Sequence, residues 1–145
     1  GVEKDLEKSL KWLEKAVDAK NPYAMTQLAN NYMNGYGVNK DYKKAVALFR
    51  EAALLDNAQA AYNLGYMHTI GLGVPMDNKE SIFWYERAAS LGSQDAQINL
   101  GFIYILAQGV DKDMKKAASY IKQAKESGNE KAISIWEEFE LEKYL

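Results

Sequence analysis

The sequence of 145 residues contains no cysteine and only one histidine, His68. Without cysteine the chain has no disulfide, no thiolate metal ligand and no cysteine nucleophile. A single histidine cannot provide a pair of imidazole ligands for a metal or complete a cysteine–histidine catalytic set. We therefore expect no catalytic residues, no metal and no cofactor, and we interpret the protein as non-enzymatic.

The sequence also lacks a marked excess of either charge. Its 18 basic and 20 acidic side chains give a net charge of -2, which does not favour nucleic acid as a partner. No apolar run approaches the roughly 18 residues of a membrane-spanning helix, so we expect no membrane insertion. The lack of cysteine does not decide the compartment, and a periplasmic or secreted location is slightly favoured over a cytoplasmic one.

What the chain does contain is one pattern that recurs every 36 residues without insertion or deletion. Three sets of positions show it, namely Ala24, Ala60, Ala96 and Ala132; Asp5, Asp41, Asp77 and Asp113; and Ala16, Ala52, Ala88 and Ala124. A period of this length predicts an array of stacked supersecondary units. Such an array presents an extended surface and not a catalytic cleft.

Each unit has the pattern of two helices joined by a glycine turn. In the second unit Ala60 and Leu64 have helical spacing, residues 71–75 interrupt it, and Trp84 and Ala88 resume it. We name the two helices of a unit A and B. The pattern predicts one all-α domain over 1–145, with about eight helices: a B helix in a half repeat (1–21), three repeats (22–57, 58–92, 93–128) and a capping helix (129–145). A half repeat at the start is consistent with a piece processed from a longer chain.

The motif of the second unit resembles a known family. It comprises Leu64-Gly65, Gly71-Leu72-Gly73-Val74, Asp77, Trp84-Tyr85 and Ala88-Ala89. This motif is similar to the Sel1-like repeat, a relative of the tetratricopeptide repeat (TPR). The resemblance implies a right-handed superhelical α-solenoid, TPR-like, whose A helices line the concave side. It also implies adaptor or scaffold roles, commonly bacterial, in signalling, secretion or host contact.

The recurring aspartates have a structural interpretation. Each directly precedes a predicted B helix, where its side chain can accept hydrogen bonds from free backbone N–H groups. Glu80, three residues after Asp77, completes the pattern of a capping box. We therefore expect N-caps at Asp5, Asp41, Asp77 and Asp113, and not a cation-binding track.

Other recurring positions predict core packing. The slot of Ala29, Gly65 and Gly101 requires a small residue because a neighbouring helix backbone is expected to pass close, and Glu137 in the last copy predicts that no further repeat packs there. His68 occupies a tyrosine slot, so we expect a partly buried structural residue. A second stripe predicts a core between repeats and comprises Trp12, Leu48, Trp84 and Tyr120.

The predicted A helices are nearly free of charge. Over 22–35, 58–70 and 94–106 there is no lysine or arginine, and Asp95 is the one acid. Amides recur there at 36-residue spacing with tyrosines beside them, and amides can both donate and accept hydrogen bonds to a peptide backbone. The expected partner-binding residues are Tyr23, Thr26, Gln27, Asn30, Tyr62, Asn63, Tyr66, Ile98, Asn99 and Phe102. The alternative is that the amides bond to neighbouring helices.

These observations favour a module that binds a protein or peptide segment in its concave groove. The third repeat adds an apolar cluster that the last helix is expected to cover in part, formed by Ile98, Phe102, Ile105 and Leu106. The alternatives are an oligomerising or structural spacer and a glycan-binding module that uses asparagine and tyrosine. A hydrolase is the least favoured alternative. The family relatives associated with that activity resemble cysteine-rich versions, and this chain has no cysteine. The sequence does not fix the oligomeric state.

Overall fold

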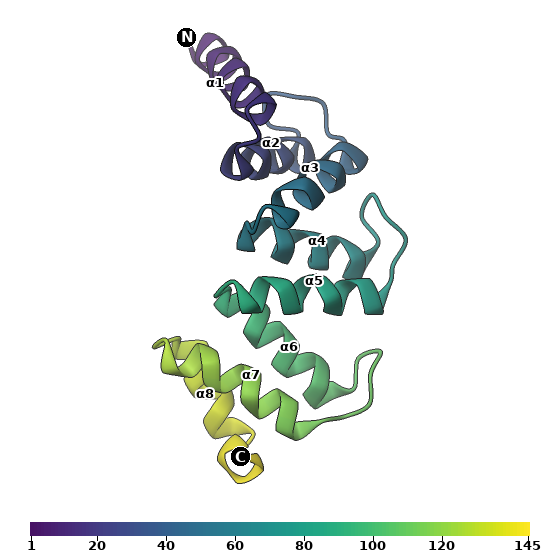
Figure 1. The fold of residues 1–145 in the computed structure, drawn as a ribbon, viewed down its shortest axis with the longest axis vertical. Helices are drawn as coiled ribbons and strands as arrows, with labels where there is room; N and C mark the ends of the chain where they lie inside the picture. The colour runs from purple at the N-terminus through teal and green to yellow at the C-terminus, as the bar shows by residue number, and fades with distance from the viewer.

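The computed structural model describes all 145 residues and contains only helices (Figure 1). This confirms the all-α prediction and its count of eight α-helices. The α-helices are α1 (Val2–Asp18), α2 (Pro22–Asn34), α3 (Tyr42–Leu54), α4 (Ala58–Ile70), α5 (Asn78–Ser90), α6 (Gln94–Leu106), α7 (Met114–Glu126) and α8 (Glu130–Glu138), and a final 3₁₀ turn, η1, spans Leu141–Tyr144. None of these helices is long and apolar enough to cross a membrane.

The helices form an elongated stack in which neighbours in the sequence are neighbours in space. In Figure 1 the chain proceeds from α1 at one end of the long axis to α8 at the other, so the termini lie at opposite ends. The long turns after α2, α4 and α6 project on the same side of the stack. This arrangement is a helical solenoid, in which α2, α4 and α6 are the A helices and α3, α5 and α7 are the B helices.

Local capping explains where these helices begin. Asp41, Asp77 and Asp113 accept hydrogen bonds from backbone N–H groups at the start of α3, α5 and α7, as predicted. Asn57 does the same for α4, and the corresponding side chains cap the other A helices and α8. The predicted cap at Asp5 is wrong, because α1 already begins at Val2 and Asp5 lies inside its first turn.

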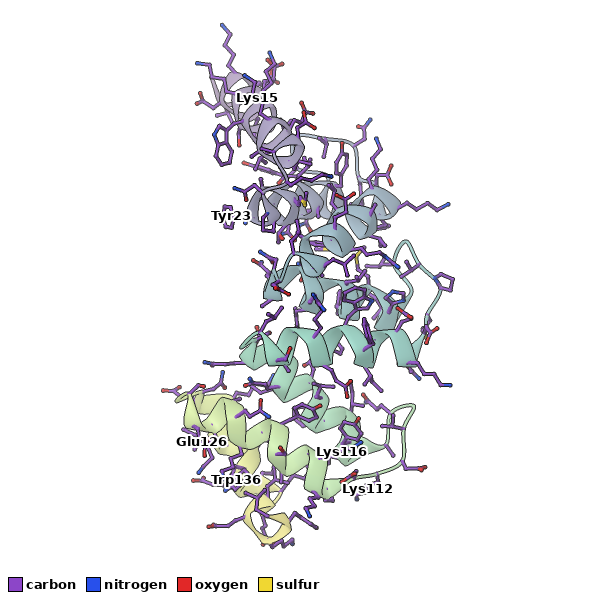
Figure 2. All side chains as sticks on the ribbon, in the orientation of Figure 1. Lys15, Tyr23, Lys112, Lys116, Glu126 and Trp136 are labelled. Atoms are coloured by element: carbon purple, nitrogen blue, oxygen red, sulfur yellow. The ribbon has the colours of Figure 1, made fainter.

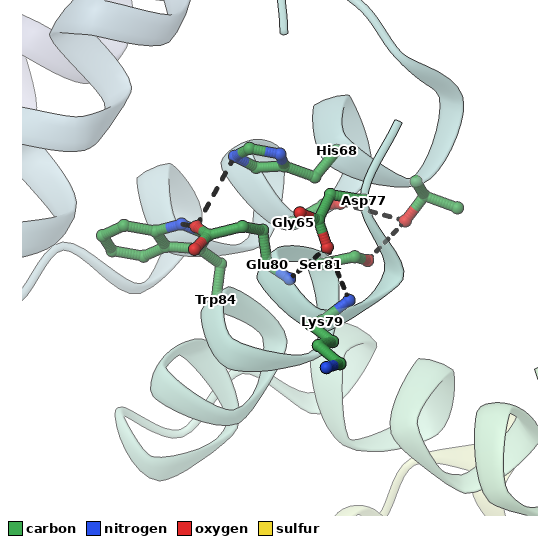
Figure 3. Close-up of polar contacts among 8 residues, drawn as sticks. Gly65, His68, Asp77, Lys79, Glu80, Ser81 and Trp84 are labelled. Carbon is green, nitrogen blue, oxygen red and sulfur yellow. Dashed lines mark hydrogen bonds and ion pairs between the residues drawn. The ribbon is translucent and has the colours of Figure 1, made fainter. Parts of the chain in front are cut away.

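The capping box predicted at Asp77 forms only in half. The Asp77 carboxylate accepts from the N–H groups of Lys79 and Glu80, at 2.9 and 3.2 Å. The Glu80 side chain does not return the bond. It accepts instead from the indole N–H of Trp84 at 3.2 Å, within the same helix (Figure 3).

The turn after α6 keeps its shape without glycine. Gly35 and Gly71 end α2 and α4 in the left-handed conformation, where glycine is unstrained. Ala107 occupies the same slot after α6 and also has a positive φ, 54°. The third repeat therefore has the same helix ending at the cost of some backbone strain.

Alanine and glycine allow the helices to approach closely. Ala24, Ala60, Ala96 and Ala132 have no exposed surface, and a Cβ atom at Gly65 would come within 2.8 Å of the Tyr85 ring. Gly101 likewise faces the side chain of Ile121. The prediction of a close-contact slot is confirmed, but the group that passes close is a side chain of the B helix and not its backbone. Glu137 in the last copy is exposed as expected.

Two core predictions need correction. Trp84 on α5, a helix that contacts both α4 and α6, is buried, but Trp12 in the same slot of α1 is 60% exposed. His68 is more deeply buried than expected, at 5% exposed, and neither ring nitrogen has a hydrogen-bond partner. Its Nε2 lies 3.9 Å from the Glu80 carboxylate, an ion-pair distance only if the ring is protonated (Figure 3).

Candidate functional site

The ten predicted binding residues all lie on the A helices α2, α4 and α6. Tyr23 and Tyr66 are exposed, at 60% and 43%, and Tyr23 projects away from the stack in Figure 2. Six more are half-buried: Gln27, Asn30, Tyr62, Asn63, Asn99 and Phe102. These eight residues place polar and aromatic groups along three successive A helices.

The remaining two predicted residues do not reach the surface. Thr26 is fully buried, and its hydroxyl donates to the carbonyl oxygen of Pro22 at 2.9 Å. Ile98 is 2% exposed and belongs to the continuous apolar core. Both share a slot with Tyr62, whose longer side chain is half-buried. The prediction of a surface position was wrong for Thr26 and Ile98, because their side chains are shorter than that of tyrosine. The Thr26 hydroxyl is hydrogen-bonded within its helix, and Ile98 packs in the apolar core.

The amide side chains connect neighbouring A helices. Asn63 Nδ2 donates to Asn30 Oδ1 at 3.3 Å, and Asn99 Nδ2 donates to the Tyr62 hydroxyl at 3.5 Å. These contacts are the inter-helix bonds that the sequence left as an alternative. They are longer than a typical hydrogen bond and use only part of each amide's capacity of two donors and two acceptor positions. The amides therefore keep donors and acceptors for a partner.

Two hollows lie along this surface. The first, of about 240 Å³, is formed by α4, α5, α6 and the turn after α6, and brings Tyr66, Asn99 and Phe102 together. The second, of about 570 Å³, is wide and shallow and has Tyr62 and Asn63 in its wall. Its other polar lining is formed by Gln59, Ser93, Gln94, Asp95 and Asn129.

Sequence reasoning missed several residues of the first hollow. Thr69 and Tyr85 line it beside the predicted residues, together with Asn78 and Gln108. Tyr85 belongs to the family motif, but its slot holds phenylalanine or isoleucine in the sister repeats, so its hydroxyl group is particular to the second repeat. These polar departures show when each position is compared across the repeats, at the exposed Thr69, Asn78 and Gln108 as well as at the buried Tyr85.

The phenol of Tyr85 is protonated at neutral pH. Burial raises its pKa above the usual value, against smaller opposing contributions from hydrogen bonding to the Thr69 hydroxyl and the Asn99 amide. The group therefore remains both a donor and an acceptor. None of the residues that line the first hollow carries a formal charge.

Charged residues concentrate elsewhere. The helices α2, α4 and α6 contain no lysine or arginine, and Asp95 is their one acid. Lysines such as Lys112 and Lys116 lie at the turn before α7 and on α7 itself (Figure 2). The structure has no group of three or more histidine, aspartate or glutamate side chains placed to hold a metal ion. The A-helix surface therefore offers neutral hydrogen bonds and aromatic contacts.

The apolar end of the surface is partly covered. Ile105 is buried within the core, and the ring of Phe102 meets Phe139, just after α8, edge to face with 6.3 Å between centroids. Leu106 is 55% exposed. Phe139, just after the last helix, thus covers part of Phe102, while Leu106 stays accessible.

Comparison with known proteins agrees with the repeat pattern. The Sel1 repeat family model matches residues 1–21, 22–57, 58–93 and 94–129. Among solved structures, the chain resembles a Sel1 repeat protein from Oxalobacter formigenes, with a TM-score of 0.83 and 37% identity over 89% of this chain and 53% of that one. It therefore spans about half the length of that protein. No curated protein matches the chain.

Two further solved structures are similar. One is a protective antigen of uropathogenic Escherichia coli strains that displays an SLR fold, with a TM-score of 0.84 and 36% identity over 89% of this chain and 28% of that one. The other is Helicobacter pylori cysteine rich protein B, with a TM-score of 0.73 and 27% identity over 93% of this chain and 97% of that one. The solenoid fold is thus shared with bacterial repeat proteins that differ in length.

Proposed function

This chain belongs to the Sel1 repeat family, whose members generally mediate protein–protein interaction, and we propose that it is a non-enzymatic module that binds a segment of a partner protein along α2, α4 and α6. The observation that carries the proposal is the uncharged surface on which amides recur at 36-residue spacing beside half-buried and exposed tyrosines. We propose that this surface works in an adaptor or scaffold, in bacterial signalling, secretion or host contact.

An extended peptide is the occupant that this chemistry suits. A peptide backbone presents one donor and one acceptor at nearly every residue, and both must be satisfied when water is displaced. Asn63 and Asn99 can supply them, because their long bonds to Asn30 and Tyr62 leave capacity unused. Tyr23 and Tyr66 add contact area at little cost in side-chain entropy.

The proposal includes no catalytic step. His68 is buried in the core and would have to lose its packing to reach a substrate. The hydroxyl groups of Thr69 and Ser81 bond to each other, and neither has an imidazole or carboxylate as its partner. Neither of these two hydroxyl groups is therefore paired with a base in the way that acyl transfer requires.

The experiment that tests this function uses the double variant Asn63→Ala with Tyr66→Ala. Immobilised wild-type chain captures partners from a lysate of the native cell, and the captured protein is then purified and titrated against each variant. We expect at least a tenfold loss of affinity with melting nearly unchanged, because truncating interface anchors costs binding without opening the core. A matched control, Tyr36→Ala with Gln123→Ala, removes an exposed aromatic ring and an exposed amide outside the A helices. Equal binding by the wild type and the double variant would contradict the proposal.

A further inference from the structure

The second repeat differs from its sister repeats at three neighbouring slots, of which the one at Thr69 is exposed and the other two are buried. It has Thr69, Ser81 and Tyr85 where repeat one has Met33, Ala45 and Phe49 and repeat three has Ile105, Ala117 and Ile121. Ser81 and Tyr85 are 3% and 2% exposed, so their hydroxyl groups lie inside the array. Because the sister repeats fold with apolar residues at these slots, the fold itself does not require the three hydroxyl groups.

The three hydroxyl groups form one cluster. Thr69 Oγ1 lies 2.6 Å from Ser81 Oγ and 3.4 Å from the Tyr85 hydroxyl, and it donates to the carbonyl oxygen of Gly65 at 2.9 Å. Mutual bonding offsets the cost of taking hydroxyls out of water. Each hydroxyl oxygen has two acceptor positions, so the cluster can still bond to a further group.

The same cluster lines the first hollow, where more polar residues depart from the repeat pattern. Asn78 occupies a slot that holds Tyr42 and Met114 in the sister repeats, and Gln108 one that holds Tyr36 and Leu72. The Asn99 amide also lines the hollow. Five lining residues are thus more polar than both of their repeat equivalents, and all five contribute to one hollow: Thr69, Asn78, Ser81, Tyr85 and Gln108.

Aromatic and aliphatic side chains complete the lining. Tyr66 and Phe102 lie in equivalent positions of α4 and α6, and Ile82 and Ile103 add aliphatic surface. The volume is about 240 Å³. At about 30 Å³ per water molecule this is room for roughly eight waters, which is enough space for the ring and hydroxyl group of a tyrosine side chain.

We propose that this hollow receives a tyrosine side chain of the bound partner segment, with its ring between the apolar walls and its hydroxyl among Thr69, Ser81, Tyr85 and the amides. This inference rests on the proposed function. A phenylalanine side chain would displace water from the polar lining without forming a hydrogen bond in its place. Sites that bind a hydroxyl group reject ligands without one for this reason. A phosphorylated or carboxylate-bearing side chain would lose its hydration in a site with no cationic partner.

The test uses small probes that do not depend on finding the partner. The ¹⁵N-labelled chain is titrated with 4-methylphenol, the analogue of a tyrosine side chain, and separately with toluene, the analogue of phenylalanine. We expect 4-methylphenol to shift the backbone signals of Thr69, Ser81 and Asn99 with millimolar affinity, and toluene to bind about tenfold more weakly. 4-Methylphenyl phosphate should not bind there.

A variant pair separates the hydroxyl groups from the shape of the hollow. Thr69→Val with Ser81→Ala removes two hydroxyls with little change of volume, and we expect the preference for 4-methylphenol over toluene to disappear. Thr26→Val with Ser119→Ala is the matched control, because Thr26 also bonds one turn back but neither residue lines the hollow. Each variant is checked for an unchanged far-ultraviolet spectrum and a cooperative melt. A Ser81→Ala single variant, which restores the residue of both sister repeats, serves if the pair fails to fold.

Several results would overturn the inference. They are equal affinity for the two probes, shifts confined to other residues, or binding of methyl β-glucoside at the hollow without binding of 4-methylphenol. If partner binding is lost in Asn63→Ala with Tyr66→Ala but unchanged in Thr69→Val with Ser81→Ala, the tyrosine pocket is wrong and the proposed function stands. The opposite result is that the hollow prefers 4-methylphenol over toluene while partner binding survives Asn63→Ala with Tyr66→Ala. That result would show that the hollow binds the small probe but that the partner does not bind along the A helices, and it would contradict the proposed function.

Discussion

The ring of Tyr85 on α5 lies against the backbone of α4 at Gly65, where a Cβ atom would come within 2.8 Å of the ring carbon Cδ1. This contact brings the two helices of the second repeat together. Gly101 has the same relationship to Ile121 in the third repeat. In the first repeat the slot is filled by Ala29, which is fully buried. The size of one residue per repeat therefore limits how closely helices A and B pack.

The first prediction follows from this contact. Gly65→Leu should lower the free energy of unfolding by about 1–3 kcal/mol or more, because a larger side chain would force the rigid Tyr85 ring and the helix apart. The measurement is a urea titration followed by circular dichroism. Glu137→Leu is the control, because Glu137 occupies the same slot on α8 but is exposed. An unchanged urea midpoint for Gly65→Leu would show that Tyr85 can move aside at little cost.

Most of the fold could be predicted from the sequence, because its determinants are local and repeated. The caps at Asp41, Asp77 and Asp113 and the small residues at Gly65 and Gly101 each act within a turn or across one helix pair. An unbroken period of 36 residues carries each local inference through the array. The predicted cap at Asp5 is wrong because Asp5 lies inside α1, a longer helix that starts before the usual capping position.

The candidate site was less predictable, because exposure depends on several elements at once. Thr26, Tyr62 and Ile98 share a slot, yet only the tyrosine is long enough to remain partly exposed. Trp12 and Trp84 share another slot but differ in exposure. Trp84 lies on α5, which contacts α4 and α6, and is buried, whereas Trp12 on α1 is exposed. The first hollow is built from three helices and a turn, so no single stretch of sequence reveals it.

The second prediction concerns capping. Asp77→Ala should destabilise the protein by about 1 kcal/mol, because the N–H groups of Lys79 and Glu80 lose their acceptor. Asp5→Ala should have a smaller effect, since Asp5 lies within the first turn of α1 and is not its cap. Thermal melts of both variants make the comparison. Equal shifts in Tm would show that the aspartates act through general charge and not through the cap.

The third prediction concerns alkaline stability. Burial, with the nearby Glu86 carboxylate, raises the pKa of Tyr120 to about 12 in the folded protein. An unfolded tyrosine ionises at about pH 10, so between these values the unfolded chain loses the proton more readily, which lowers the free energy of the unfolded state relative to the folded one. This contribution to stability is complete below about pH 10 and is lost as the pH rises through about 12.

Tyr120→Phe should therefore reduce the loss of stability between about pH 9 and pH 11. The measurement is the difference between the urea midpoints of wild type and variant at each pH. This difference reports on Tyr120, because the other tyrosines are present in both proteins. Tyr23→Phe, at an exposed ring on α2, is the control. The same pH dependence in Tyr120→Phe as in the wild type would show that the folded protein does not oppose ionisation of the half-buried Tyr120 phenol.

The last prediction distinguishes the proposed surface from the charged one. If the partner binds along α2, α4 and α6, its affinity should change by less than about threefold between about 0.05 and 0.5 M salt, since screening acts on charges and this surface carries one acid, Asp95. Isothermal titration at several salt concentrations measures the slope. A steep slope would instead place binding on a lysine-bearing surface, and Lys112→Ala with Lys115→Ala should then flatten it. A flat slope together with loss of binding in Asn63→Ala and Tyr66→Ala would place the recognition on neutral hydrogen bonds and aromatic contacts, which is the chemistry that the A helices present.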